Sequence, residues 1–435
     1  MRSPQATHNL AAMSAHAREI ALNVEQALDL SILVGVGDVI NLEPRLIVNS
    51  DEATGTEEPT AVYDQGRRAG GAWNFKRAQP HQLAAMLAYA LGQCSSSDVP
   101  GSTGGRKHVF TPLDGYVDAG RGLPSFTAAQ RYGKTVLKRR FASCFVDSLT
   151  INCPKDDFIQ ATATLKATGK VTSNLVEESV TALDNVTQLT LAANAVQGAT
   201  AQERLDAVQQ VVAEYPAASG VWAPVTVTAV SDATPAVLTI TSLGGAGAST
   251  TYKVFYADKE PGGDWRAFPA RVSEPPLKVS ELAVVVGGKW DGSTITGGRQ
   301  LTSEIKSLSW TLNNNVEVES TPGGGADYAN RALRGQRTQK LTLGREFWDA
   351  VWQELRLTAA ATFSVYMKAE GALLNAGEAA RYTLGMCWPL CCLTASPISA
   401  DGARLAETPE IQVLQDATHG SLYAWVINKG TTYGA

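Results

Sequence analysis

The stretch SLSWTLNNNVEVEST, residues Ser307–Thr321, alternates apolar and polar residues and then places three asparagines in a row. The alternation has the two-residue period of a β-strand with one buried face. It would divide the side chains into a buried and a polar stripe: Leu308, Trp310 and Leu312 on the first, Ser309, Thr311 and Asn313 on the second. Asparagine tolerates bulged and left-handed backbone. The run NNN therefore predicts either a bend within one long strand, 305–319, or the turn of a shorter hairpin.

The same alternation occurs earlier in the chain, in FASCFVDSLTINC (141–153) and FIQATATLKATGKV (158–171). In the second segment, small apolar residues alternate with Thr162, Thr164 and Lys166, which would share one polar face. Only PKDD separates the two segments, so we expect a long hairpin over 141–172. Strands of this length exceed the roughly five or six residues that are usual.

Other segments predict helices and loops. Helical periodicity occurs in 9–30, 80–92, 199–215 and 349–357, and Gly92 is placed to end the second of these helices. Residues 48–80 and 95–125 lack clear periodicity and predict loops. Helices do not alternate regularly with strands, so the expected fold class is α+β, mostly β, with an antiparallel β-sandwich or barrel and a flanking helix.

Composition divides the chain into four parts. We expect an N-terminal helical or extended segment (1–47), a first part of the β core (48–175), a small inserted α/β domain (176–260) and a second part of the core with the C-terminal strands (261–435). The middle part is interpreted as an insertion because the strand pattern of the core resumes after a linker rich in proline and glycine.

The overall composition argues against several classes of protein. A net charge of −5 over 435 residues does not fit a basic nucleic-acid binder. The six cysteines match neither a disulfide scaffold nor the paired ligands of a zinc site, even where three of them gather in CWPLCC. The sequence shows no secretory signal core and no long apolar run, so the cytoplasm is the default compartment expected.

No motif supports catalysis. GVGDVI lacks the third glycine of a dinucleotide-binding loop, and GSTGGRKH lacks the ending of a phosphate-binding P-loop. Neither a paired-histidine zinc motif nor a serine nucleophile elbow occurs. We therefore expect no enzyme activity, no catalytic or metal-binding residues and no cofactor.

Several segments together resemble the tail tube proteins of long-tailed, siphophage-type bacteriophages. They are EPRLIVNSDEATGTEEP (43–59), FTPLDGYVDAG (110–120), CFVDSLTINCPKDDFIQATATLKATGKV (144–171), the opening stretch, and AETPEIQVLQDATHGSLYAWVINKGT (406–431). The likeness covers roughly 40–175 and 275–435 and rests on the pattern and order of the segments. It departs from the family at 176–258, because many tail tube proteins have no insertion or carry an immunoglobulin-like one near the C-terminus.

The resemblance implies a structural virion protein without enzyme activity. Copies would form hexameric rings, each copy lending two long hairpins to an inner barrel, and the rings would stack into a tube. Phage DNA would pass through the lumen without sequence-specific binding. The implied partners are the protein itself and the tail terminator, tape measure and baseplate or tip proteins, with no membrane. The implied location is the virion tail, assembled in the host cytoplasm.

Two sets of site residues follow from this resemblance. The candidate polar face of the inner barrel comprises Thr162, Thr164, Lys166, Ser309, Thr311, Asn313, Glu317 and Glu319. The two glutamates, if lumenal, would repel the DNA backbone. The candidate inter-ring loop comprises Glu52, Thr54, Glu57, Glu58, Tyr63, Arg67, Arg68, Trp73 and Phe75.

Three other interpretations stay open at this point. A multidomain β-sandwich adhesin could bind carbohydrate or a receptor through some of the nine tryptophans. A β-rich hydrolase would need an acid–base constellation, which the sequence does not offer. The tube protein of a type VI secretion system would share the ring but is normally a far shorter chain.

Overall fold

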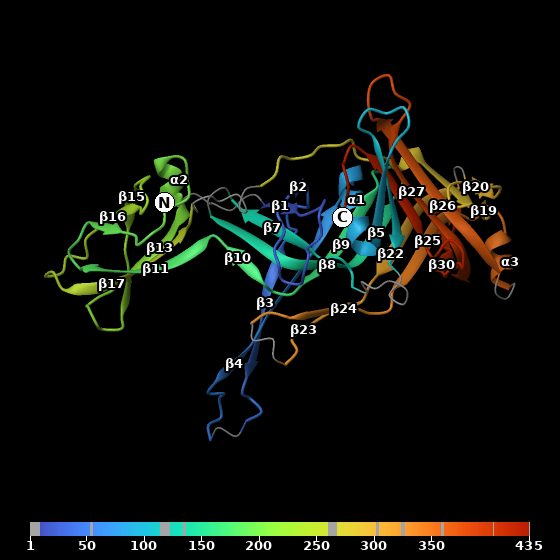
Figure 1. Ribbon diagram of the computed structural model, residues 1–435. Coiled ribbons are helices and arrows are strands. Elements are labelled where there is room, and N and C mark those ends of the chain that lie inside the picture. The colour runs from blue at the N-terminus through green and yellow to red at the C-terminus, as the bar shows by residue number, and fades with distance from the viewer. Residues whose placement is uncertain are drawn as a thin grey trace. The chain divides into compact units, whose positions relative to one another are not determined.

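A computed structural model of the protein describes residues 9–52, 55–113, 122–133, 136–259, 268–301, 304–322, 327–357, 361–402 and 404–434 (Figure 1). In these ranges the chain is mostly β, with antiparallel ladders and three α-helices: α1 (Pro80–Leu91), α2 (Ala201–Ala207) and α3 (Val351–Leu357). The prediction of an α+β, mostly β fold is confirmed. The chain divides into two compact units: 1–12, 129–141 and 171–269 form the first, and 13–128, 142–170 and 270–435 the second.

The second unit is built on one long series of paired strands. From one end the series is β3 (Ile40–Val48), β4 (Val62–Phe75), β9 (Gln160–Ala167), β8 (Leu137–Cys153), β22 (Ile305–Asn313), β25 (Thr338–Glu346), β30 (Glu410–Val413) and β27 (Arg381–Ala395). Only the part of β8 from residue 142 onward belongs to this unit.

At β27 the series of paired strands divides, because different parts of this long strand pair with β30 and β31 (Tyr423–Asn428), while β26 (Thr362–Leu373) pairs along most of its length. On one side follow β26, β18 (Leu282–Val286) and β21 (Arg299–Gln300). On the other follow β31, β6 (Arg106–Pro112) and β5 (Gly92–Asp98).

Short strands complete the second unit. They are β2 (Leu30–Ile32), β19 (Lys289–Trp290), β20 (Ile295–Thr296), β23 (Val316–Glu319), β24 (Arg331–Arg334), β28 (Ile398–Asp401) and β29 (Arg404–Glu407), with a 3-10 turn at Val279–Glu281. Strands β19 and β20 pair with each other, as do β23 and β24.

Helix α1 lies in the core of the second unit, where every one of its residues is buried. The sequence begins and ends this helix as expected: Pro80 occupies the first turn, and Gly92 adopts the left-handed conformation (φ 95°) after it. Gln79 precedes the helix, and its backbone N–H donates to the side chain of Gln82, so this N–H group has a hydrogen-bond partner at the start of α1. The helix predicted over 80–92 is confirmed, as is the one over 349–357, which is α3.

The helix predicted over 9–30 is wrong. The chain instead forms β1 (Asn9–Met13) and β2, joined by an irregular segment. The carboxylate of Asp29 accepts hydrogen bonds from the backbone N–H groups of Ala15 and His16, and the buried carboxylate of Glu19 accepts from Ser125, Thr127 and Ser143. These long-range bonds hold the alanine-rich segment in place and outweigh its helix propensity.

Both predicted loops contain strands. Residues 48–80 hold β4, which pairs with β3 as an antiparallel hairpin, and 95–125 hold most of β5 and all of β6. The sequence signal fails here because these strands are short of apolar residues on either face. Their backbone groups pair with other strands, β4 with β3 and β9, and β6 with β5 and β31. This pairing, rather than a side-chain pattern, fixes them as strands.

The three asparagines interrupt a long antiparallel hairpin. Strand β22 stops at Asn313 and pairs with β25, Asn315 takes the left-handed conformation (φ 49°), and beyond it β23 pairs with β24, the strand that precedes β25. The strand predicted over 305–319 is therefore broken at 314–315, where a bend was expected, and the alternative of a hairpin turn at NNN is wrong because β22 and β23 pair with other strands. Asn314 is fully buried: its Nδ2 donates to the carbonyls of Ala90 in α1 (2.9 Å) and Val146 (3.0 Å).

The first unit holds the remaining strands. They are β10 (Val171–Ser173), β11 (Leu175–Leu183), β12 (Gln188–Thr190), β13 (Val208–Glu214), β14 (Trp222–Pro224), β15 (Val227–Val230), β16 (Val237–Ile240) and β17 (Ser249–Ala257). Strands β1, β7 (Phe126–Tyr132) and β8 contribute residues to both units.

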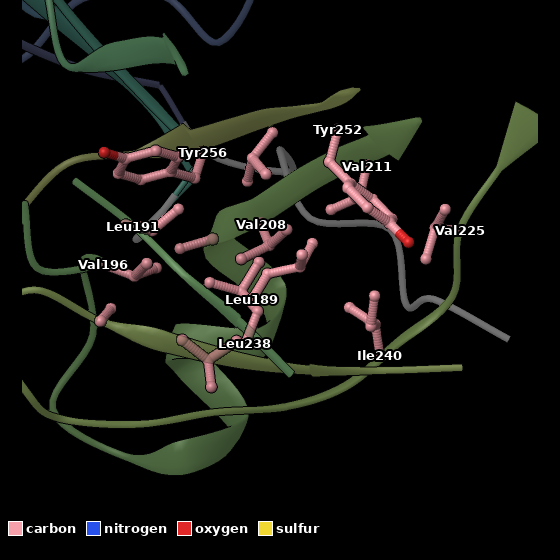
Figure 2. Close-up of a cluster of buried hydrophobic side chains, with 14 of the residues drawn as sticks. Leu189, Leu191, Val196, Val208, Val211, Val225, Leu238, Ile240, Tyr252 and Tyr256 are labelled. Carbon is pink, nitrogen blue, oxygen red and sulfur yellow. The ribbon is translucent and has the colours of Figure 1, made fainter. Parts of the chain in front are cut away.

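Residues 175–257 enclose a core of their own. One sheet, β11–β17–β13–β14, and a second, β12–β16–β15, direct aliphatic and tyrosine side chains toward each other (Figure 2). Leu175 pairs with Ala257, so the chain enters and leaves this segment at adjacent points, as an insertion requires. The helix predicted over 199–215 is too long: α2 ends at Ala207, and 208–214 join the first sheet because Val208, Val211 and Ala213 pack into its core.

The buried amide of Asn314 generates a first prediction. Replacing Asn314 with alanine leaves the Ala90 and Val146 carbonyls without their donor, and this should lower the free energy of unfolding by about 1–3 kcal/mol. Urea denaturation measures the change. Asn185→Ala, at an exposed turn, is the matched control and should shift stability by less than about 0.5 kcal/mol. Equal effects of the two substitutions would contradict the role given to Asn314.

A buried histidine generates a second prediction. His108 in β6 is fully buried, contacts Ser96 (2.7 Å) and Asn428 (3.0 Å), and meets the ring of Tyr433 edge-on. Burial lowers the pKa of His108 from 6.5 to about 4, an effect that Arg106 reinforces and Glu274 opposes. The folded protein therefore needs the neutral ring, and stability present above pH 6.5 is lost as the pH falls toward 4.

We expect the protonation of His108 to lower the free energy of unfolding by roughly 3 kcal/mol as the pH falls from 6.5 to about 4. Urea denaturation at pH 7 and pH 4.5 of the wild type and of His108→Asn measures it. The variant should be less stable at pH 7 but lose less stability on acidification. Parallel pH profiles for the two proteins would show that His108 does not carry the effect.

Candidate functional site

The polar residues predicted on separate strands lie side by side on one face of one sheet. Thr162 in β9 pairs with Thr150 in β8, which pairs with Thr311 in β22. One neighbouring row consists of Thr164, Ser148 and Asn313, and the row on the other side consists of Gln160, Asn152 and Ser309. We call these nine residues, with Lys166, the polar sheet face. The sequence predicted that the polar residues of 158–171 and of 307–313 each share one strand face, and this prediction is confirmed for both segments.

The polar sheet face is rich in hydroxyl and amide groups. Thr162 donates to the side chain of Asn74 (2.9 Å), and the hydroxyls of Thr150 and Thr311 lie 3.2 Å apart. The two lysines at its margin have acidic neighbours: Lys166 lies 3.1 Å from Asp147, and Lys340 lies 2.6 Å from Glu410. The face is therefore nearly neutral and offers few unpaired cations to a polyanion.

The opposite face of these strands is buried. It carries Ala161, Ala163 and Leu165 from β9, Leu149 and Ile151 from β8, and Leu308, Trp310 and Leu312 from β22. One face thus fixes the sheet in the core while the other remains partly accessible.

Glu317 and Glu319 are not part of the polar sheet face. They lie on β23, whose Val316 and Val318 are buried against Phe145. Both glutamates line a groove of about 630 Å³, together with Glu43, Arg68 and Lys166. The structure thus places six of the eight predicted residues on one sheet face and two on a neighbouring ribbon.

Asp147, which no sequence pattern singled out, joins the polar sheet face to β23. It is the extra residue of a β-bulge in β8. Its backbone carbonyl accepts from the N–H of Asn314 (2.7 Å), and its carboxylate accepts from the N–H of Val316 (2.7 Å) and pairs with Lys166. Lys166 also donates to the carbonyl of Val316 (2.8 Å). A bulge has no sequence signal of its own, so this link was not predictable.

The hairpin β3–β4, here called the arm, projects beyond the sheet to which its base belongs (Figure 1). Its outer half pairs only with itself among the described residues, whereas residues 69–75 of β4 also pair with β9. Large apolar side chains are exposed along the outer half: Leu46, Ile47, Val48, Val62 and Tyr63, at 42–59% of their surface. Exposed apolar residues grouped in this way indicate an interaction surface.

The tip of the arm is ordered by its own hydrogen bonds. The buried side chain of Asn49 accepts from the N–H groups of Thr60 and Ala61, both at 3.0 Å. The hydroxyl of Tyr63 donates to Glu52 (2.8 Å), and this bond raises the pKa of the tyrosine. Glu57 and Glu58 are exposed nearby. Thr54, also predicted at this site, lies outside the described residues.

The base of the arm is clamped to the core. The N–H of Arg67 donates to the carbonyl of Asp327 (2.6 Å), and a side chain at position 66 would collide with that oxygen, so Gly66 is required there. Trp73 and Phe75 are buried. These two predicted contact residues therefore anchor the arm and are not part of its exposed surface.

The described part of the chain was expected to hold no metal site, and its ionisable groups can be checked for one. No group of three or more His, Cys, Asp or Glu residues is placed to hold a metal ion there. The cysteines described are free thiols, and burial raises the pKa of Cys153 and of Cys387 to about 12, which leaves both unreactive at neutral pH. None of the helices in the described ranges has the length and hydrophobicity needed to span a membrane.

Comparison with known proteins identifies no relative: no protein-family model matches the chain, and no curated protein matches its sequence.

Proposed function

We propose that the protein is a structural subunit that assembles with copies of itself into stacked rings, forming the tail tube of a long-tailed bacteriophage. The observation that carries this proposal is the polar sheet face. On it, nine residues with hydroxyl or amide side chains, from three strands, are aligned on one partly accessible surface. The order and pattern of the sequence segments that resemble tail tube proteins support it.

A nearly neutral polar surface suits the lining of a channel for DNA. Affinity for DNA depends mainly on lysines and arginines that neutralise phosphates. Hydroxyl and amide groups bind water and contact the duplex only weakly, so DNA can slide past them. The two lysines on or beside the face are held next to carboxylates, which reduces their attraction for phosphate.

The arm supports assembly. An isolated β-hairpin with a free edge and exposed apolar residues would invite aggregation in a protein that stayed monomeric. In an assembled ring or tube, the same features would contact the next subunit and be covered.

The alternative of a carbohydrate-binding adhesin loses its main support. Such a module would present aromatic rings to solvent. Of the eight tryptophans in the described ranges, six are buried, and only Trp222 and Trp348 are exposed. These two belong to different units of the chain.

Trimming the arm tests the proposal. Val48 and Val62 pair across the hairpin, so replacing residues 49–61 with Asn-Gly should close it with a tight turn. In sedimentation velocity, the wild type should form large species as its concentration rises, whereas the trimmed protein should remain monomeric with an unchanged circular dichroism spectrum. Ser50→Ala, at an exposed position of the same tip, is the control and should assemble normally. A wild type that remains monomeric at every concentration would contradict the proposal.

A further inference from the structure

A second accessible surface of the same unit complements the arm. A groove of about 1160 Å³ runs along β24 and the turn after it. Residues 111–113 at the end of β6 and residues 419–422 also line it. This volume exceeds the roughly 300–1,000 Å³ of small-molecule sites. We call it the arginine groove.

The described lining of the arginine groove carries two arginines, Arg334 and Arg337, and no acidic residue. Asp416, which follows the lining residue Gln415, is engaged by the backbone N–H groups of Thr418 and His419. Arg337 donates through Nε to the buried Asn314. The Nε of Arg334 is buried and has no hydrogen-bond partner among the described residues.

The arginine groove also offers a backbone edge. Strand β24 pairs only with β23 among the described residues, so its other edge has no partner strand there and could pair with an extended segment. Leu333 on this strand exposes 39% of its surface and lines the groove. An occupant should therefore be an extended segment that carries both acidic and apolar side chains.

The arm of another copy has this chemistry. Residues 49–63 include Asp51, Glu52, Glu57 and Glu58 and no lysine or arginine. The exposed Val48, Val62 and Tyr63 flank this acidic tip. The arm and the arginine groove are separate surfaces of one subunit, so their contact would be heterologous and would generate a ring or a filament.

We propose that the acidic tip of the arm of one subunit docks in the arginine groove of the next. Glu57 and Glu58 face Arg334, the apolar residues of the arm cover Leu333, and the arm extends the ribbon of β23 and β24. This inference rests on the proposed self-assembly and names the two surfaces that carry it.

Charge reversal on each surface tests the docking. Arg334→Glu on the groove, and Glu57→Lys with Glu58→Lys on the arm, should each weaken assembly by roughly tenfold or more, because like charges then meet in the interface. Lys289→Glu, on an exposed residue of β19 that does not line the groove, is the matched control and should assemble as the wild type does. Arg334→Gln removes the charge without reversing it and should weaken assembly to an intermediate degree. Such a graded effect would show that the loss in Arg334→Glu comes from charge and not from misfolding.

Mixing the two reversed proteins gives the decisive readout by sedimentation velocity. The reversed arm should dock in the reversed groove, and the unchanged arm in the unchanged groove, so an equimolar mixture should assemble although neither protein does alone. Assembly by Arg334→Glu alone at the wild-type concentration would overturn the docking and leave the proposed function standing. A mixture that stays monomeric would also overturn it. A wild type that never assembles would instead reject the proposed function itself.

Discussion

The antiparallel ladder of β9, β8 and β22 is the constraint on which the rest of the second unit depends. Its buried face packs into the core that contains α1, and its register fixes which hydroxyl and amide groups reach the other face. A shift of one residue in any of the three strands would exchange the buried and polar faces. The packing of Trp310 and its neighbours in the core therefore also determines the surface proposed to face DNA.

The same ladder positions the other surfaces. Its edge continues into β4, so the arm is an extension of a strand whose inner half is held in the core. Within the ladder, the bulge at Asp147 binds the backbone N–H groups of Asn314 and Val316, where the chain passes from β22 into β23. The arm and the arginine groove are thus both attached to a rigid sheet. Rigid attachment lowers the entropy that docking two copies would cost.

Some of this organisation could be predicted because it depends on local patterns. The period of two in Leu308, Trp310 and Leu312 placed these residues in the core, where all three are fully buried. Proline at the start and glycine after the end located α1. These signals succeed because burial and backbone conformation act on the residues that carry them.

The remainder depends on partners distant in sequence. Glu19 and Asp29 hold 9–30 out of a helix through bonds to residues that a local pattern does not include. The strands of the arm are fixed by pairing rather than by alternation. The arginine groove brings together residues from 111 to 422, so no local motif could have indicated it.

Electron microscopy of the concentrated, negatively stained protein tests the central claim most directly. We expect stacked rings or hollow tubes with a central channel wide enough for duplex DNA. Solid fibres without a channel, or single particles at every concentration, would contradict it.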